Sequence, residues 1–410
     1  MPTINLASNK LPVLVLQMSR GRLHHGQLGI VRSLGRLGVP VWVFRTGPWA
    51  PVPRSRFVAG SFESHFLSRT PEQSLEQLLL AGRHIGQRTI LIPTDDVGAV
   101  FVNEHADALA EQFDFPDQPA GLARRLASKK GMYELCKQFG VPTPETIFPR
   151  NRAEVEAFAR STALPVAVKA IEAGRIRPHS GAQSVFIAHS ASELLDYYDC
   201  AENAEQPNLM LQEYIPGGAE SVWMFNGYFD AHSDCLVGFT GQKLRQNPPY
   251  TGATTLGMCV PNVAVEEATC GFMKALGYRG ILDIGWRYDI RDGQYKVLDA
   301  NPRIGATFRL FVGTNGMDVA RALYLDLTGQ AVPRSRAPGG RKWVVENQDA
   351  TASLVYWKDR KLTPGQWARS FRGVREAAWF AGDDPLPFAI MCGAGVVRTL
   401  RAWRGAKDTP

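Results

Sequence analysis

The chain has 410 residues, 45% of them hydrophobic and 21% charged, which predicts a globular protein of two or three domains; no run approaches the ~18 apolar residues of a membrane span. Its net charge of +7 favours anionic small molecules or an anionic surface as partners, and the lack of a basic run argues against nucleic-acid binding. The six cysteines lack CxxC spacing and the N-terminus lacks a signal-peptide pattern, so we expect no zinc site, no disulfide framework and a cytoplasmic protein.

Residues 1–125 alternate strands and helices in the order that is typical of a parallel sheet. An apolar run at 12–17 precedes a Gly/Arg/His-rich loop, a helical pattern at 28–38 and a second strand at 41–44. The segment 89–105 repeats this order and carries Asp95 and Asp96 where its strand ends, the place at which open α/β sheets bind ligands. Asp95 would serve equally well as the N-cap of the following helix, and both interpretations stay open.

Residues 126–332 predict a second domain of mixed α and β structure. An amphipathic helix at 127–139 ends at GVPTP, and strands interrupted by a helix are expected within 160–215, which would form a small lobe. Antiparallel strands are expected in 221–260. The sequence GILDIGWRYDIRDGQYKVLDANPR (280–303) predicts a hairpin that turns at 291–293.

Residues 333–410 follow a Pro/Gly/Arg-rich linker and have no assigned role. We expect this region either to close the active site or to form a homodimer contact. Its last apolar run is followed by several arginines, which favours a helix packed on the main body over one lying on an anionic membrane surface.

The hairpin carries polar side chains at every second position of the segment VLDANPR. Asp299, Asn301 and Arg303 would share one face of the strand. Carboxylate and amide oxygens suit Mg²⁺, and a guanidinium suits phosphate or carboxylate. Asp283 on the neighbouring strand, offset from Asp299, adds a second carboxylate, so the pair predicts a cradle for one or two Mg²⁺ ions. A solvated hairpin with a polar turn at Pro302 is the alternative.

Three other features indicate ligand contacts. Lys169 interrupts an apolar strand, and a lysine there needs either an anionic ligand or an edge that faces solvent. The segment 212–215 follows an apolar strand and could present backbone groups and a carboxylate to an adenine edge. His24 and His25 lie in the first loop, where a solvated position is favoured over a substrate contact.

These residues, in this order, resemble the ATP-grasp superfamily of carboxylate–amine ligases, in the group that includes D-aspartate ligase and carbamoyl-phosphate synthase. The resemblance covers residues 12–330 and is most specific in GILD and LDANPR. It implies an α/β and α+β protein: a Rossmann-like pre-ATP-grasp domain (1–125), a two-lobed ATP-grasp domain (126–332, with 160–215 as the lid lobe) and a C-terminal extension (333–410).

The resemblance also implies a role for each matching residue. ATP would be bound by two phosphate-contacting lysines, the phosphate loop, the adenine hinge and a ribose-binding acid: Lys129, Lys169, Gly181, Ala182, Gln212, Glu213, Tyr214, Ile215 and Glu220. One or two Mg²⁺ ions, or Mn²⁺ as an alternative, would be held by Asp283, Asp299 and Asn301. The acyl-phosphate region would be held by the basic residues Arg303, Lys243 and, as a further candidate, Arg245.

The sequence departs from the family pattern at four positions. Ser128 stands where an acid is usual, and the segment 172–184 is less glycine-rich than the family's phosphate loop. Asp299 replaces the commoner Glu. Gly285 occupies the position at which the family's first carboxylate aligns, so we expect Asp283, two residues earlier on the same face, to substitute.

The implied activity is ATP-dependent ligation. A small-molecule carboxylate would be activated as an acyl phosphate and joined to an amine, with release of ADP and phosphate; an amino acid or a cell-wall precursor would fit these roles. Two alternatives are a bicarbonate-phosphorylating enzyme of the carboxylase type and a catalytically silent ATP-binding regulatory protein.

Overall fold

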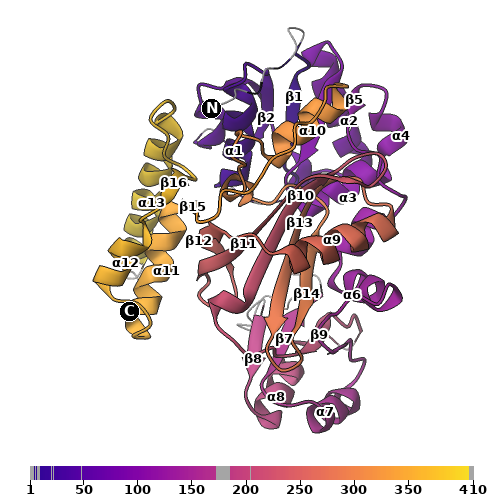
Figure 1. Ribbon diagram of the computed structural model, residues 1–410, viewed down its shortest axis with the longest axis vertical. Helices are drawn as coiled ribbons and strands as arrows, with labels where there is room; N and C mark the ends of the chain where they lie inside the picture. The colour runs from indigo at the N-terminus through magenta and orange to yellow at the C-terminus, as the bar shows by residue number, and fades with distance from the viewer. Residues whose placement is uncertain are drawn as a thin grey trace.

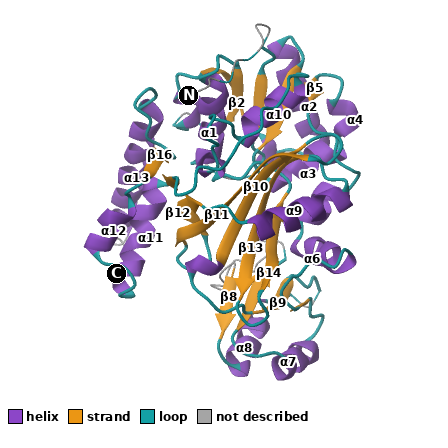
Figure 2. Ribbon diagram, in the orientation of Figure 1, coloured by secondary structure: helices purple, strands orange, loops and turns teal. Residues whose placement is uncertain are grey.

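Three β-sheets organise the computed structural model (Figure 1). The structure describes residues 4–405 apart from 5, 7–9, 20, 22, 48, 172–184 and 204, with side chains as far as residue 395. The N-terminal sheet lies at the top of Figure 1 and the smallest sheet at the bottom, and the strands of the central sheet run between them (Figure 2).

The N-terminal sheet is parallel, with strand order β3-β2-β1-β4-β5, as the strand–helix–strand pattern predicted. Alternate residues of β1 pack against α1 on one face and against α2 and α3 on the other, so that all four residues of this strand are fully buried. The elements are β1 (Val13–Leu16), α1 (His25–Gly35), β2 (Val41–Arg45), β3 (Val58–Glu63), α2 (Pro71–Ile85), β4 (Thr89–Pro93), α3 (Asp96–Glu104), α4 (Ala106–Leu109) and β5 (Phe113–Asp114).

The small sheet has the order β6-β9-β7-β8 and is covered on one face by α7 and α8. Val166 and Val168 point into that apolar face. Because side chains alternate along a strand, Lys169 points to the opposite face of the sheet. The elements are β6 (Thr146–Ile147), α7 (Arg152–Ser161), β7 (Val166–Ala170), β8 (Val185–Ala188), α8 (Ala191–Ala201) and β9 (Leu209–Glu213).

The central sheet has the order β14-β13-β10-β11-β12-β15-β16. The predicted hairpin is confirmed: Asp283 pairs with Asn301 and Gly285 with Asp299, so the two carboxylates are offset as expected. The helix α9 was not predicted. The elements are α5 (Leu122–Ala127), α6 (Lys129–Gln138), β10 (Val222–Phe229), β11 (Cys235–Asn247), β12 (Ala253–Cys259), α9 (Val263–Leu276), β13 (Gly280–Asp289), β14 (Gln294–Asn301) and α10 (Val319–Leu327).

The C-terminal region extends the central sheet. β15 (Lys342–Val344) pairs antiparallel with β12, and β16 (Val374–Ala377) pairs parallel with β15. α11 (Glu346–Lys358), α12 (Pro364–Ser370) and α13 (Leu386–Gly405) lie beside these strands, in yellow in Figure 1. Phe388 and Met391 pack into the main core, so the described part of α13 lies on the body of the protein, as expected.

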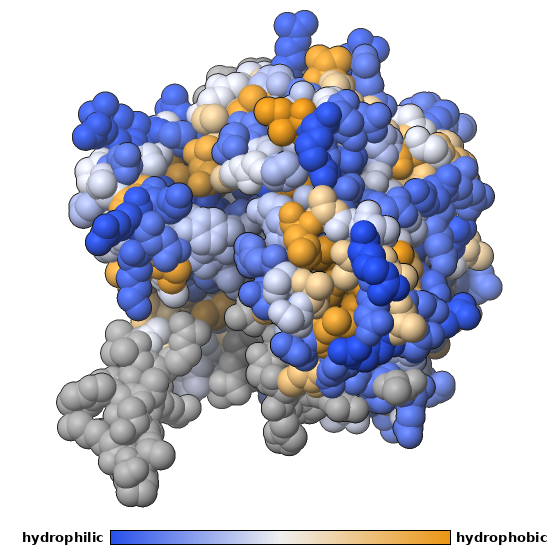
Figure 3. Space-filling model, turned by 90° about the horizontal axis from the view of Figure 1, so that it is seen from below, coloured by the Kyte–Doolittle hydropathy of each residue, from blue (hydrophilic) through white to orange (hydrophobic). Residues whose placement is uncertain are grey.

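No helix in the part of the chain that the structure describes is both long and apolar enough to cross a bilayer. On the face seen from below, the hydrophobic residues outside the grey atoms form separate groups among hydrophilic ones (Figure 3).

Candidate active site

Polar side chains at the end of β14 form one hydrogen-bonded chain. The Asn301 amide donates to Asp299 Oδ2 at 3.3 Å and to the Asp283 carbonyl oxygen at 3.2 Å. Arg303 Nη2 donates to Asn301 Oδ1 at 3.0 Å. The three side chains predicted to share a face therefore do point together, and Asp283 lies across the hairpin from them.

Asp283 is a carboxylate in an unfavourable environment. Its pKa is raised to about 6, chiefly by burial and also by the nearby Asp299 and Asp96, while Arg303 and Lys243 act in the opposite direction. Its Oδ2 lies 4.0 Å from Arg303 Nη1. Carboxylates gathered in this way are stabilised when a cation sits between them.

The donor set fits a divalent ion of the Mg²⁺ type. Within the described residues no group of three or more His, Cys, Asp and Glu side chains is placed to hold a metal. An ion here would draw on Asp283, Asp299 and the amide oxygen of Asn301, with phosphate oxygens completing its shell, as Mg²⁺ commonly does. A Cβ at Gly285 would lie 2.2 Å from Asp299 Oδ1, so the glycine leaves room for that carboxylate.

Two lysines face the same carboxylates from other elements. Lys129 is the first residue of α6, and burial lowers its pKa while Asp299 and Asp96 oppose that shift. Lys169 donates to Gln212 Oε1 at 2.6 Å, and burial lowers its pKa to about 8. Both cations therefore lie in the field of Asp299, in positions suited to an anionic ligand.

We expect ATP binding to weaken above about pH 8. In the role predicted for Lys169, a phosphate binds its ammonium form, so above its lowered pKa binding must take up a proton, and the dissociation constant should rise about tenfold per pH unit. Asp299, Lys129 and Arg287 are the charged groups that act on this lysine. Calorimetric titration of Mg-ADP between pH 7 and 9.5 measures the effect. Lys169→Arg, which stays charged, should flatten the profile, and a flat wild-type profile would contradict the prediction.

The segment predicted as the adenine hinge ends the small sheet. Gln212 and Ile215 are buried, and the Glu213 carboxylate accepts from Arg291 at 3.1 Å and Lys296 at 3.3 Å. The Glu213 side chain is thus engaged with the hairpin, so a nucleotide contact here would come from the backbone after it. Tyr214 lies under the guanidinium of Arg287, 5.6 Å from the ring centroid.

Three other predicted residues have different surroundings. Glu220 is exposed, and its carboxylate accepts from the Gly218 N–H at 2.7 Å. Lys243 donates to the Gly252 carbonyl oxygen at 3.2 Å while remaining in the field of Asp283. Arg245 instead makes a buried bidentate ion pair with Asp349, at 2.7 and 2.9 Å. A β-bulge between Lys243 and Arg245 turns their side chains in different directions. Arg245 therefore joins β11 to Asp349 in the structure. Gly181 and Ala182 lie outside the described residues.

The N-terminal sheet supplies Asp96, which the sequence analysis placed at a strand end but gave no role in the site. Asp96 Oδ1 accepts from Arg303 Nε at 2.9 Å. The adjacent Asp95 caps α3 through the Gly98 N–H at 2.7 Å and accepts from the Met18 and Ser19 N–H groups, so its capping interpretation is confirmed. The position of both acids at the end of β4 was the available signal.

The two histidines are not solvated, contrary to the favoured expectation. His24 caps α1 by accepting from the Gln27 N–H at 3.2 Å, and burial lowers its pKa to about 4. The ring nitrogens of His25 are buried, and the ring packs against Trp343 and Trp379 at 5.6 and 6.2 Å between centroids. The C-terminal region therefore packs against the N-terminal end of α1.

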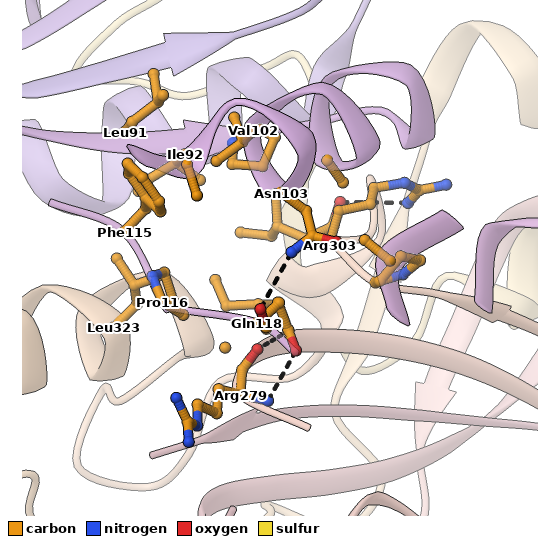
Figure 4. Close-up of a pocket in the computed structure, with 18 of the residues that line it drawn as sticks. Leu91, Ile92, Val102, Asn103, Phe115, Pro116, Gln118, Arg279, Arg303 and Leu323 are labelled. Atoms are coloured by element: carbon orange, nitrogen blue, oxygen red, sulfur yellow. Dashed lines mark hydrogen bonds between the residues drawn. The ribbon is translucent and has the colours of Figure 1, made fainter. Parts of the chain in front are cut away.

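A mainly apolar pocket lies between α3 and the start of β13 (Figure 4). Phe115, Leu323 and Val102 line one side, and Gln118, linked to Arg279, lines the other. The guanidinium of Arg303 points away from these apolar residues. Arg303 itself lines the pocket, together with Pro302 and Ile304, so the pocket adjoins the carboxylate cluster.

Solved structures share this architecture, which agrees with the fold that the resemblance to the ATP-grasp superfamily implied. L-amino acid ligase from Bacillus licheniformis has a TM-score of 0.61 at 16% identity, covering 82% of this chain and 79% of that one. N5-carboxyaminoimidazole synthetase from Staphylococcus aureus has a TM-score of 0.61 at 12% identity, covering 87% and 88%.

Curated sequences point the same way, although no protein-family model matches the chain. D-aspartate ligase of Enterococcus faecium (strain Aus0004) is 26% identical over 247 residues, 57% of this chain and 58% of that protein. The C-terminal section of the Methanopyrus kandleri carbamoyl phosphate synthase large chain is 21% identical over 248 residues, covering 57% and 44%. The matched region thus spans about half the length of these relatives.

Proposed function

We propose that the protein is an ATP-dependent carboxylate–amine ligase. The observation that carries the proposal is the convergence of Lys129 and Lys169 on Asp299, next to the chain formed by Asn301 and Arg303. The similarity to D-aspartate ligase and the fold shared with L-amino acid ligase support it.

The proposed reaction begins with transfer of the γ-phosphoryl group to a carboxylate. The bond from the γ-phosphorus to ADP breaks and a carboxylate oxygen bonds to phosphorus, giving an acyl phosphate whose phosphate leaves readily. Lys129 and Lys169 hold the phosphates, and Arg303 stabilises charge on the group in transfer. Mg²⁺, held by Asp283, Asp299 and Asn301, would neutralise phosphate charge. An amine then attacks the acyl carbon and expels phosphate.

The remaining predicted residues take supporting roles in this proposal. The backbone after Gln212 would contact adenine, Glu220 the ribose, and Lys243 the acyl-phosphate region. The small lobe would exclude water, which otherwise hydrolyses the intermediate. The domain division at 125 and 332 and the cytoplasmic location belong to the same proposal.

The test measures ADP release and hydroxamate formation by the purified protein with Mg-ATP and hydroxylamine, across amino acids and small carboxylates. We expect a hydroxamate from at least one carboxylate. Asp299→Ala should lower its rate by about 10²–10³-fold, because the site loses one of the two carboxylates that would hold the divalent cation.

Asp292→Ala is the matched control, because Asp292 lies in the turn of the same hairpin, paired with Lys296 at 2.9 Å. We expect this variant to keep its rate within about twofold, as surface ion pairs contribute little. Full turnover by Asp299→Ala would contradict the proposal. ADP release that requires bicarbonate and ignores amines would favour the carboxylase-type alternative, and ATP binding without turnover would favour the regulatory one.

A further inference from the structure

The ion pair between Arg303 and Asp96 joins the hairpin to the N-terminal sheet. Asp96 is the first residue of α3, and its Oδ1 accepts from Arg303 Nε at 2.9 Å across 207 residues of sequence. The two side chains differ in exposure: Arg303 is 17% exposed and Asp96 is 42% exposed. The acid therefore keeps a surface toward solvent while the arginine is largely enclosed.

Arg303 is oriented by other groups as well. Its Nη1 donates to the Ile304 carbonyl oxygen at 3.2 Å and its Nη2 to Asn301 Oδ1 at 3.0 Å. Asp96 contacts the guanidinium through Nε alone, without the bidentate geometry that is typical of a purely structural arginine–carboxylate pair. The position of Arg303 thus depends on Asp96 only in part.

Apart from Lys243, Arg303 and Asp96 are the charged groups of the site that the proposed function assigns to neither the nucleotide nor the cation. In the proposed function, Lys129 and Lys169 face phosphates, and Asp283 and Asp299 face a divalent cation. Arg303 and Asp96 then present one positive and one negative group to the second substrate. A simple carboxylate near Arg303 would be repelled by Asp96, whereas a zwitterion would satisfy both charges.

We propose that Asp96 makes the site selective for an amino acid as the carboxylate substrate, by binding the substrate ammonium group while Arg303 binds the carboxylate. The inference rests on the proposed function. Asp96 is then a specificity-determining residue that the N-terminal sheet supplies to the active site.

The test compares amino acids with their des-amino counterparts: alanine with propionate, aspartate with succinate, and glutamate with glutarate. Hydroxamate formation gives kcat/KM for each member of a pair. For the pair with the fastest amino acid, we expect kcat/KM of the wild-type protein to be about 100-fold or more higher for the amino acid than for its des-amino counterpart. A ratio of this size is typical of a substrate group whose charged partner in the site would otherwise be left unpaired.

Asp96→Asn keeps the shape of the side chain and an oxygen that can accept from Arg303 Nε, but it removes the charge. We expect the preference of this variant to be at least about tenfold smaller, because kcat/KM falls for the amino acid and stays unchanged for the des-amino acid. Glu104→Gln is the matched control, because Glu104 ends the same helix in an exposed pair with Arg124 at 2.6 Å. Calorimetric binding of the amino acid in the presence of Mg-ADP provides a readout without turnover.

Three results would overturn the inference. An equal fall for both members of a pair in Asp96→Asn would show that Asp96 only positions Arg303. Equal wild-type kcat/KM values for the two members would show that the site lacks this selectivity, without contradicting the proposed ligase function. Absence of a hydroxamate from every carboxylate would instead reject the proposed function, and the inference with it.

Discussion

Replacement of Arg303 by lysine is expected to lower hydroxamate formation by about 10²–10³-fold while the affinity for Mg-ADP changes little. The guanidinium uses three separate donors, toward Asp96, Ile304 and Asn301. A lysine ammonium is a compact charge on a flexible stem and cannot hold these directions together. The variant should therefore lose stabilisation of the phosphoryl group in transfer, which depends most on geometry. Nucleotide binding by the two lysines should be retained.

Single-turnover ADP release and calorimetric Mg-ADP binding measure the two effects separately. Arg279→Lys is a suitable control, because Arg279 immediately precedes β13 and its guanidinium forms an exposed pair with Asp117 at 3.2 Å. Unchanged turnover in Arg303→Lys would show that Arg303 only braces the hairpin against α3.

Replacement of Asp349 by alanine is expected to destabilise the fold by about 3–5 kcal/mol, because it leaves the Arg245 guanidinium buried without its partner. Asp349 is 2% exposed, and Arg245 is 6% exposed. Asp349 also accepts from Thr255 at 3.1 Å and from the Trp367 indole at 3.2 Å, so one carboxylate serves β11, β12 and α12. Its loss should loosen the C-terminal region from the central sheet.

The free energy of unfolding in urea measures this effect. Glu63→Ala is the control, because its pair with Arg45 at 3.3 Å is exposed and should contribute less than about 1 kcal/mol. The double replacement Arg245→Met with Asp349→Leu should recover much of the loss, since it removes both buried charges. A cost near that of Glu63→Ala would contradict the assignment of Arg245 to packing.

The sequence alone identified those parts of the protein whose signals are local. The strands of the N-terminal sheet, the lysine in β7 and the hairpin with its offset carboxylates all follow from periodicity and turn residues within a short span. The face shared by Asp299 and Asn301 is a property of one strand, so spacing predicts it. The resemblance added roles to these residues but not their contacts.

The tertiary structure decided every contact between distant segments. Asp95 and Asp96 are adjacent and chemically alike, but one caps α3 while the other reaches Arg303, because only the first can turn back to the helix N-terminus. Arg245 is two residues from Lys243, yet a bulge sends it to Asp349.

The C-terminal region is the largest case of this kind. β15 and β16 are short, and nothing near them in sequence indicates that they extend the central sheet. β15 pairs with β12, which lies more than 80 residues earlier, and β16 pairs with β15. Pairing at such separation depends on which strand edges and charged groups are still without partners once the rest of the chain has folded. A local sequence pattern contains no information about those partners.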